Sequence, residues 1–203
     1  MGVLGGAFNP PHVGHLLLAQ EAAATLGLDE VVLVPTGVAP HKRIDPEPGP
    51  EVRLEMARAA VAGSERLRVS ALEVEREGPS FAYRTLELLR DEKPGSDLTF
   101  VMGADAAAGL EAWRRPERVL ELARIAVAER PGADRSAVDA VLERLGAPAP
   151  AELVEMPQVE ISSSLVRKRV REGMPIRWMV PDAVADLIAE RGLYASAPAE
   201  APR

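Results

Sequence analysis

Segments with the pattern of strands and segments with the pattern of helices alternate along this chain of 203 residues. Short runs of Val, Leu and Ile indicate buried strands, and longer stretches rich in Ala, Leu and Glu between them favour helices. Such alternation is typical of a parallel sheet whose crossover helices cover both faces. The sequence therefore predicts an α/β fold built on one doubly wound parallel sheet.

The predicted elements cover most of the chain. Strands are expected at residues 3–4, 30–35, 67–75, 98–102, 125–128 and 153–156, and helices at 15–24, 52–62, 83–90, 113–122, 136–145, 163–171 and 181–191. The length suits a single core, so residues 1–194 are assigned to one domain, with the helices from about residue 162 packed on it. The small, Pro-rich stretch 195–203 is expected to be disordered, and Trp178 is expected to be packed.

Composition excludes several functional classes. The absence of cysteine excludes disulfides, Cys-ligated zinc and thiol nucleophiles. The net charge of -7 argues against an extended nucleic-acid surface, although it allows a local basic pocket for a small polyanion. No apolar run approaches the roughly 18 residues of a membrane span, and the N-terminus lacks the basic start of a signal peptide. We expect a cytoplasmic protein with no nucleic-acid or membrane partner, while a homo-oligomer stays open.

Parallel sheets of this kind bind ligands at the carboxyl ends of their strands. This rule selects four loops as the expected functional edge: residues 5–15, 35–42, 103–113 and 157–167. The only histidines of the chain, His12, His15 and His41, fall in the first two of these loops. Any imidazole chemistry is therefore expected at this edge.

The first loop has the pattern of a phosphate-binding turn. Gly5 and Gly6 allow the backbone to approach a ligand closely, and the Pro pair that follows stiffens the approach to the helix. His12 and His15 are three residues apart and share one face if the helix has begun. The free N–H groups of a helix start favour an anion. Two histidines that only cap the helix are the plain alternative, and zinc is disfavoured because no third ligand is near.

The sequence of this loop, GGAFNPPHVGH, resembles the signature of the HxGH nucleotidyltransferase superfamily, whose fold is Rossmann-like. Further segments resemble motifs of bacterial nicotinate-nucleotide adenylyltransferases, namely residues 34–42, 80–86, 103–105 with Trp113, 161–167 and the closing pattern 179–194. The resemblance runs in collinear order over nearly the whole chain. It departs at Asn9, where Asp is common, and at Ala39, Ala82 and Arg84.

The resemblance implies that ATP and nicotinate mononucleotide react to give nicotinate adenine dinucleotide and pyrophosphate, a step of NAD biosynthesis. The implied catalytic residues are His12, His15, Lys42 and Arg167. ATP is expected to contact Gly5, Gly6, Ala7, Phe8, His12, His15, Gly103, Asp105, Ile161, Ser162, Ser163 and Arg167. The acceptor is expected to contact Asn9, Lys42, Ser80, Thr85, Asp105 and Trp113, and Arg84 is a further candidate for its carboxylate.

The implied chemistry accounts for the lack of a general base in these motifs. The nucleophile is a phosphate oxygen that is already ionised at neutral pH, so catalysis consists of positioning and charge neutralisation. Mg²⁺ is expected to arrive with ATP, held mainly by phosphates and water, and no protein metal site is assigned.

Three of these residues also have ordinary structural explanations. Lys42 is compatible with a solvated loop cation, Asp105 with a helix N-cap, and Trp113 with a core side chain. The alternative activities are adenylyl transfer to nicotinamide mononucleotide or to pantetheine phosphate, and nucleotide binding without catalysis. The retained imidazoles and cations favour an enzyme.

Overall fold

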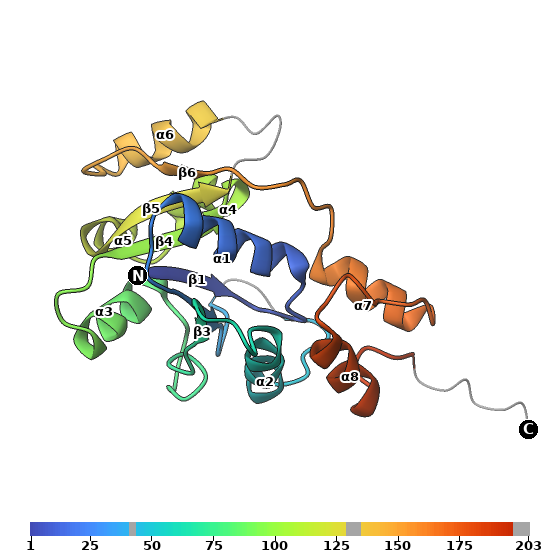
Figure 1. Cartoon of the computed structure of the whole chain (residues 1–203). Coiled ribbons are helices and arrows are strands. Elements are labelled where there is room, and N and C mark those ends of the chain that lie inside the picture. The colour runs from blue at the N-terminus through green and yellow to red at the C-terminus, as the bar shows by residue number, and fades with distance from the viewer. Residues whose placement is uncertain (41–43, 129–134, 197–203) are drawn as a thin grey trace, which may run out of the picture.

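The computed structural model describes residues 1–40, 44–128 and 135–196, and within these ranges six parallel strands form one sheet in the order β3-β2-β1-β4-β5-β6. Figure 1 shows the sheet with helices on both sides. The strands are β1 (Gly2–Gly6), β2 (Val31–Pro35), β3 (Leu67–Val69), β4 (Leu98–Gly103), β5 (Ala123–Ala128) and β6 (Glu152–Val154). The predicted doubly wound parallel sheet is confirmed.

In the part of the chain that the structure describes, every connection between successive strands contains at least one helix, and two more helices follow β6. The helices are α1 (Val13–Thr25), α2 (Pro50–Ala60), α3 (Ala82–Glu92), α4 (Ala104–Ala108), α5 (Pro116–Leu122), α6 (Arg135–Arg144), α7 (Ser163–Arg171) and α8 (Asp182–Glu190), with a short 3-10 helix, η1, at Leu110–Ala112. α2 and α5 each begin with proline, which is favourable in the first turn because that position needs no N–H donor. None of the helices in the described ranges combines the length and apolarity that a membrane crossing requires.

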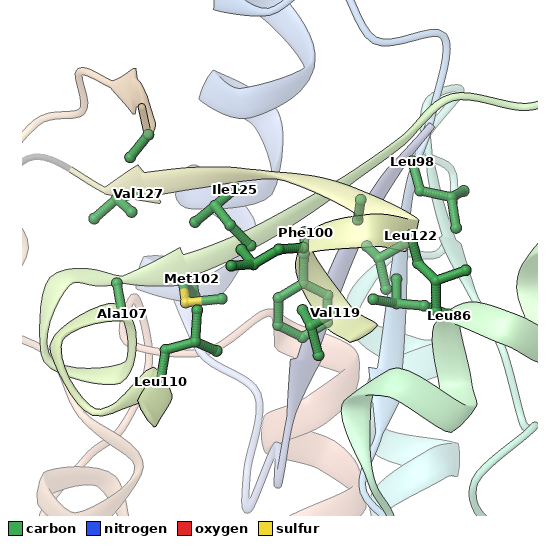
Figure 2. Packing of buried hydrophobic residues seen from close by; sticks show 14 of the residues in the cluster. Leu86, Leu98, Phe100, Met102, Ala107, Leu110, Val119, Leu122, Ile125 and Val127 are labelled. Atoms are coloured by element: carbon green, nitrogen blue, oxygen red, sulfur yellow. The ribbon is translucent and has the colours of Figure 1, made fainter. Parts of the chain in front are cut away.

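Successive side chains of each strand face opposite sides of the sheet, and each side has its own apolar core. On one side Phe100 of β4 packs with Leu86 of α3 and Val119 of α5 (Figure 2). On the other side Leu33 of β2 packs in a cluster with Leu18 of α1. Strands buried on both faces need nearly continuous apolar sequence, which explains the Val- and Leu-rich runs that predicted them.

The C-terminal helices α7 and α8 pack with α2 beside the sheet (Figure 1). Their shared cluster contains Met56 of α2, Val166 of α7, Val184 of α8 and Tyr194. The last part of the chain is thereby joined to the segments that leave β1 and β2.

The strand order reverses between β1 and β4, which are neighbours in space although β2 and β3 separate them in sequence. Ligands of such sheets bind in the crevice outside the carboxyl ends of the strands at this reversal. β1 ends at Gly6 and β4 ends at Gly103, so two of the four predicted loops begin side by side. The topology therefore places the expected functional edge at this point.

Some predicted elements differ from the structure. Residues 103–113 form α4 and η1 rather than a loop, because the Ala-rich run favours a helix. β3 ends at Val69 rather than near residue 75, because the chain turns and the Val74 amide donates to the Ala71 carbonyl. The prediction that Trp178 is packed is wrong, since 75% of its surface is exposed and its ring lies under Arg177. In the predicted tail, residues 197–203 lie outside the described residues.

Candidate active site

His12 and His15 lie against each other at the start of α1. His12 is the N-cap residue, with an extended backbone, and its N–H donates to Nδ1 of His15 at 3.2 Å. The two ring centroids are 3.7 Å apart. Phe8 packs edge-on against His15, with ring centroids 5.0 Å apart. The structure therefore brings the two histidines together at a helix N-terminus, as their spacing predicts.

Both imidazoles are neutral over the physiological pH range. Burial lowers the pKa of His12 to about 4. Burial, together with the neighbouring His12, lowers the pKa of His15 to about 3. Because Nδ1 of His15 accepts a backbone N–H, its neutral ring holds the proton on Nε2 and can donate from there. Nδ1 of His12 is buried and has no hydrogen-bond partner among the described residues. An anion beside the pair would raise both pKa values.

A cavity of about 660 Å³ opens beside this histidine pair, and we call it the histidine cavity. Its lining includes Gly5, His12, Gly14, His15, Phe100, Gly103, Trp113, Ile161 and Ser162. A Cβ at Gly14 would stand 3.1 Å from the His12 ring, so glycine permits the close contact between helix and imidazole. The structure thus gathers predicted ATP ligands from three separate loops around one space.

Ser163 and Arg167, two further predicted ATP ligands, hold the loop that follows β1. The Ser163 hydroxyl donates to the Pro10 carbonyl at 2.8 Å. The Arg167 guanidinium donates to the Asn9 carbonyl at 2.7 Å. Ser162 caps α7 by accepting the Leu165 N–H at 3.1 Å. The start of α7 is therefore fastened to the histidine loop by polar contacts.

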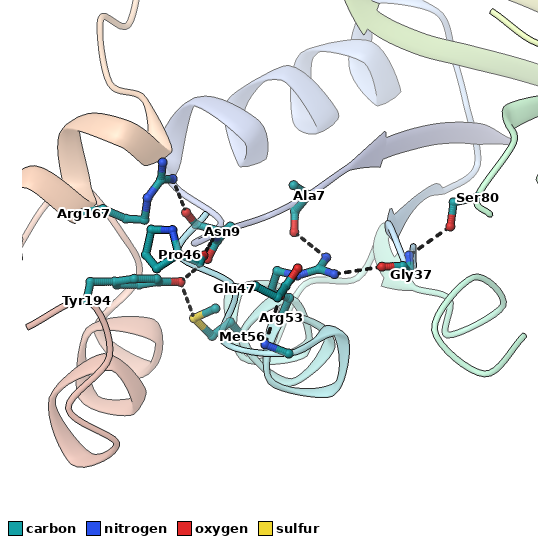
Figure 3. Close-up of polar contacts among 11 residues, drawn as sticks. Ala7, Asn9, Gly37, Pro46, Glu47, Arg53, Met56, Ser80, Arg167 and Tyr194 are labelled. Carbon is teal, nitrogen blue, oxygen red and sulfur yellow. Dashed lines mark hydrogen bonds and ion pairs between the residues drawn. The ribbon is translucent and has the colours of Figure 1, made fainter. Parts of the chain in front are cut away.

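Asn9, a predicted acceptor ligand, is buried, and its side chain joins three parts of the chain (Figure 3). Its Nδ2 donates to the Pro46 carbonyl at 2.7 Å, and its Oδ1 accepts the Tyr194 hydroxyl at 2.5 Å. Burial raises the pKa of Tyr194, which keeps that hydroxyl protonated as a donor. The structure supports a role for Asn9 in holding the loop rather than in direct contact with a substrate.

A second cavity of about 430 Å³, which we call the acceptor cavity, adjoins the first. Gly5, Phe100 and Trp113 line both cavities. Trp113 is half-buried and packs edge-on against Phe100, with ring centroids 5.9 Å apart. The lining of the acceptor cavity also includes Gly6, Thr36, Glu73, Ser80, Phe81, Thr85 and Arg114. Two compartments that share one wall suit a reaction between two ligands.

Polar contacts behind the acceptor cavity hold its wall in place. The Thr85 hydroxyl donates to Oε1 of Glu73 at 2.5 Å. The Ser80 hydroxyl accepts the Gly37 N–H at 3.0 Å. Burial raises the pKa of Glu73, although the hydroxyls of Thr85 and Ser80 act in the opposite direction. Ser80 and Thr85 therefore line this cavity, and their side chains hold its wall in place.

The remaining predicted site residues lie in different environments. Asp105 is exposed in the first turn of α4, directly after the strand end that meets the histidine cavity. Ala7 and Phe8 form the turn between β1 and the histidines. Arg84 is exposed and pairs with Glu87 at 3.3 Å. Lys42 lies outside the described residues.

Sequence reasoning missed Arg53 and Glu73, which are both buried. A signal for Arg53 is present in the sequence, since helical spacing places it on the same face of α2 as the apolar Met56 and Ala57. Glu73 has no comparable signal, because the turn that buries it depends on contacts with the distant Gly37 and Thr85.

Comparison with known proteins identifies the family. The cytidylyltransferase-like family matches residues 3–169. A curated relative from Roseiflexus sp. (strain RS-1), named "Probable nicotinate-nucleotide adenylyltransferase", is 45% identical over 96% of this chain and 97% of its own. A relative of the same name from Tropheryma whipplei (strain Twist) is 42% identical over 95% of this chain and 98% of its own. The chain belongs to the nicotinate-nucleotide adenylyltransferase family. The family resemblance drawn from the motifs is confirmed.

Solved structures show the same fold at lower sequence identity. Plasmodium falciparum nicotinic acid mononucleotide adenylyltransferase, complexed with NaAD, has a TM-score of 0.74 and 20% identity over 95% of this chain and 96% of its own. The same enzyme complexed with APC has a TM-score of 0.73 at 20% identity and the same coverage. The fold of this chain is therefore shared with solved structures of low sequence identity.

Proposed function

We propose that this protein transfers the adenylyl group of ATP to nicotinate mononucleotide, producing nicotinate adenine dinucleotide and pyrophosphate in NAD biosynthesis. Family membership supports the reaction. The structural observation that carries the proposal is the pair of adjoining cavities that meet at Gly5, Phe100 and Trp113. ATP occupies the histidine cavity, and the acceptor occupies the neighbouring one.

The transfer is a single displacement at the α-phosphorus of ATP. A phosphate oxygen of the acceptor forms the new P–O bond, and the bond between the α-phosphorus and the bridging oxygen of pyrophosphate breaks. The acceptor phosphate is ionised at neutral pH, so no residue has to remove a proton. The protein contributes orientation and stabilisation of the charge that moves onto the leaving group.

His12 and His15 provide that stabilisation at the start of α1. His15 donates from Nε2, since its Nδ1 is held by the backbone. The N-terminus of α1 adds its partial positive charge to the same place. As negative charge gathers on the phosphates, both histidines become more basic, so they strengthen as donors during the transfer. Because the rings are neutral in the free protein, they gain positive charge only when phosphate is bound beside them.

ATP enters as its complex with a divalent cation, which we propose to be Mg²⁺. The described residues include no group of three His, Asp or Glu side chains arranged to hold a metal ion. Such a cation arrives on the phosphates as part of the substrate and keeps water in its coordination shell.

Arg114 is the residue we propose to favour an acid over an amide on the acceptor ring. It is the only cation among the described residues that line the acceptor cavity. The Glu73 carboxyl in the same lining accepts a hydrogen bond from the Thr85 hydroxyl, and burial favours the neutral form of Glu73. The sequence candidate for this role, Arg84, is instead paired with Glu87.

The proposed function is tested by comparing acceptors with the purified full chain, ATP and MgCl₂. Dinucleotide and pyrophosphate are quantified with nicotinate mononucleotide, nicotinamide mononucleotide and pantetheine phosphate. The highest kcat/KM is expected with nicotinate mononucleotide. Equal or faster turnover of either other acceptor would overturn the assignment.

The same assay tests the selectivity assigned to Arg114. Arg114→Gln is expected to reduce the preference for the acid by about tenfold, which is typical for the loss of one charge-assisted contact. Arg84→Gln is the matched control because it removes an arginine whose partner is Glu87. Equal selectivity in both variants would remove Arg114 from this role.

A further inference from the structure

Arg53 of α2 is a cation with no exposed side-chain surface, and it connects the two loops that border the cavities (Figure 3). Its Nη1 donates to the Ala7 carbonyl at 2.9 Å, and its Nη2 donates to the Gly37 carbonyl at 3.1 Å. Its Nε donates to Oε1 of Glu47 at 2.9 Å. One planar group therefore reaches the loop after β1, the start of the loop after β2 and the segment before α2.

A packed apolar side chain would suit this face of α2 at lower cost. Met56 and Ala57 on the same face are fully buried, and burying a guanidinium requires costly removal of its water. Its counter-ion, Glu47, keeps 37% of its side-chain surface exposed. The ion pair therefore offsets only part of the free energy that is lost when the guanidinium is removed from water. The two backbone carbonyls are the contacts that only a fork of several N–H donors can make together.

On the ATP side, Arg53 holds a turn that is strained. Phe8 has a φ of 47°, a left-handed conformation that is unfavourable for a residue with a bulky side chain. Arg53 binds the carbonyl just before Phe8, and Arg167 binds the carbonyl of Asn9 just after it. Such a conformation persists where neighbouring contacts determine it on both sides. The Phe8 ring in turn packs against His15.

On the acceptor side, Arg53 holds Gly37 from its carbonyl while Ser80 holds Gly37 from its N–H. Gly37 lies close against the backbone of Glu73, because a Cβ at Gly37 would stand 2.0 Å from the Glu73 carbonyl oxygen. Thr36, Glu73 and Ser80 all line the acceptor cavity. The position of this wall is therefore linked through one guanidinium to the turn that carries His15.

We propose that Arg53 is a positioning residue that fixes the histidine loop and the acceptor loop relative to each other. Its two carbonyl contacts set the separation between the ATP phosphates and the acceptor phosphate. This inference rests on the proposed adenylyl transfer. It assigns Arg53 no contact with either substrate, and its effect passes through Ala7 and Gly37.

The test uses Arg53→Met, which keeps an unbranched apolar stem in place of the aliphatic part of arginine and removes every donor. Arg58→Met removes an exposed arginine from the same helix, and Leu54→Ala removes buried packing from it. These two controls separate loss of charge and loss of stability from loss of the clamp. Melting temperature, kcat and the KM of each substrate are measured with the other substrate saturating, at a temperature where all variants are folded.

For Arg53→Met we expect kcat/KM to fall about 100-fold, because a misplacement of reacting groups by about 1 Å has an effect of this size. The KM of ATP and the KM of the acceptor should both rise. Arg58→Met and Leu54→Ala are expected to stay within about threefold of the wild type in every constant, because neither touches a loop carbonyl. Arg53→Lys, which retains the charge but not the fork, is expected to lie between the wild type and Arg53→Met. It also serves as the test if Arg53→Met does not fold.

Ser80→Ala isolates the acceptor side of the clamp, because the Ser80 hydroxyl contacts Gly37 and Glu73 but no residue of the histidine loop. It should raise the KM of the acceptor alone. The proposal is overturned if Arg53→Met reproduces that one-sided pattern, or if its constants match those of Leu54→Ala. Failure of the proposed function is distinguishable, since it would appear in the wild type as absent or no longer preferred turnover of nicotinate mononucleotide, whereas failure of this inference leaves the activity and acceptor preference of the wild type intact.

Discussion

The unusual electrostatic feature of the site is a pair of neutral imidazoles, one buried and one half-buried, and it makes stability sensitive to acid. The folded pKa values of His12 and His15, about 4 and about 3, lie below the ordinary value of 6.5. As pH falls, the unfolded chain therefore binds protons before the folded chain does. The stability that the neutral pair contributes is complete above pH 6.5 and is lost as pH falls toward the folded values.

The size of the loss between pH 7 and pH 5 follows from these values. At pH 5 an imidazole in the unfolded chain is protonated, whereas His12 and His15 in the folded protein stay neutral. The difference of 1.5 pH units from 6.5 corresponds to about 2 kcal/mol for each ring, or about 4 kcal/mol for the pair. A typical domain has about 5–15 kcal/mol in total, so the effect is readily measured.

Urea unfolding at both pH values, without nucleotide, measures this loss. The reference is a double variant with His12→Asn and His15→Asn, whose side chains do not titrate and whose amide oxygen at position 15 replaces the Nδ1 acceptor. Carboxylates titrate alike in both proteins, so the difference between their losses isolates the imidazoles. The wild type should lose about 4 kcal/mol more than the double variant. Equal losses would refute the neutral state assigned to the pair.

Three further changes probe the walls of the site. Tyr194→Phe leaves the buried Asn9 Oδ1 without its donor and should lower the free energy of unfolding by about 1–3 kcal/mol in urea titrations. Gly37→Ala places a Cβ against the Glu73 carbonyl and should cost at least about 2 kcal/mol, with a raised acceptor KM; wild-type stability and KM would contradict the geometry. Trp113→Ala should raise the acceptor KM about tenfold or more through lost ring packing, and an unchanged KM in steady-state assays would exclude the aromatic contact.

Much of the fold was predictable because its information is local. Runs such as residues 31–35 and 98–102 are apolar except for Thr99, since both faces of a parallel strand are buried. The Gly5–Gly6 turn and the His12/His15 spacing also place their chemistry within one short segment. The rule that ligands bind at the carboxyl ends of parallel strands then predicted that the other loops lie at the same edge of the sheet.

The roles of individual polar residues were less predictable because they depend on distant partners. Asn9 and Arg167 are bound to each other across most of the chain, so a motif identifies them without revealing that they hold the loop. Arg53 donates to two backbone carbonyls, and every residue has such a carbonyl, so the amino-acid sequence does not reveal these partners. Trp178 shows the converse, since its apolar ring gave no indication that it would be exposed.

The central claim is adenylyl transfer at the histidine cavity, and the fate of the α-phosphate of ATP tests it most directly. ATP labelled at the α-phosphorus is incubated with MgCl₂ and nicotinate mononucleotide, and the label is followed into dinucleotide and free nucleotide. We predict one labelled dinucleotide for each pyrophosphate released, and a rate at least about 100-fold lower in His15→Ala at unchanged fold. Label that remains in free nucleotide while pyrophosphate forms, or full activity in His15→Ala, would contradict the account.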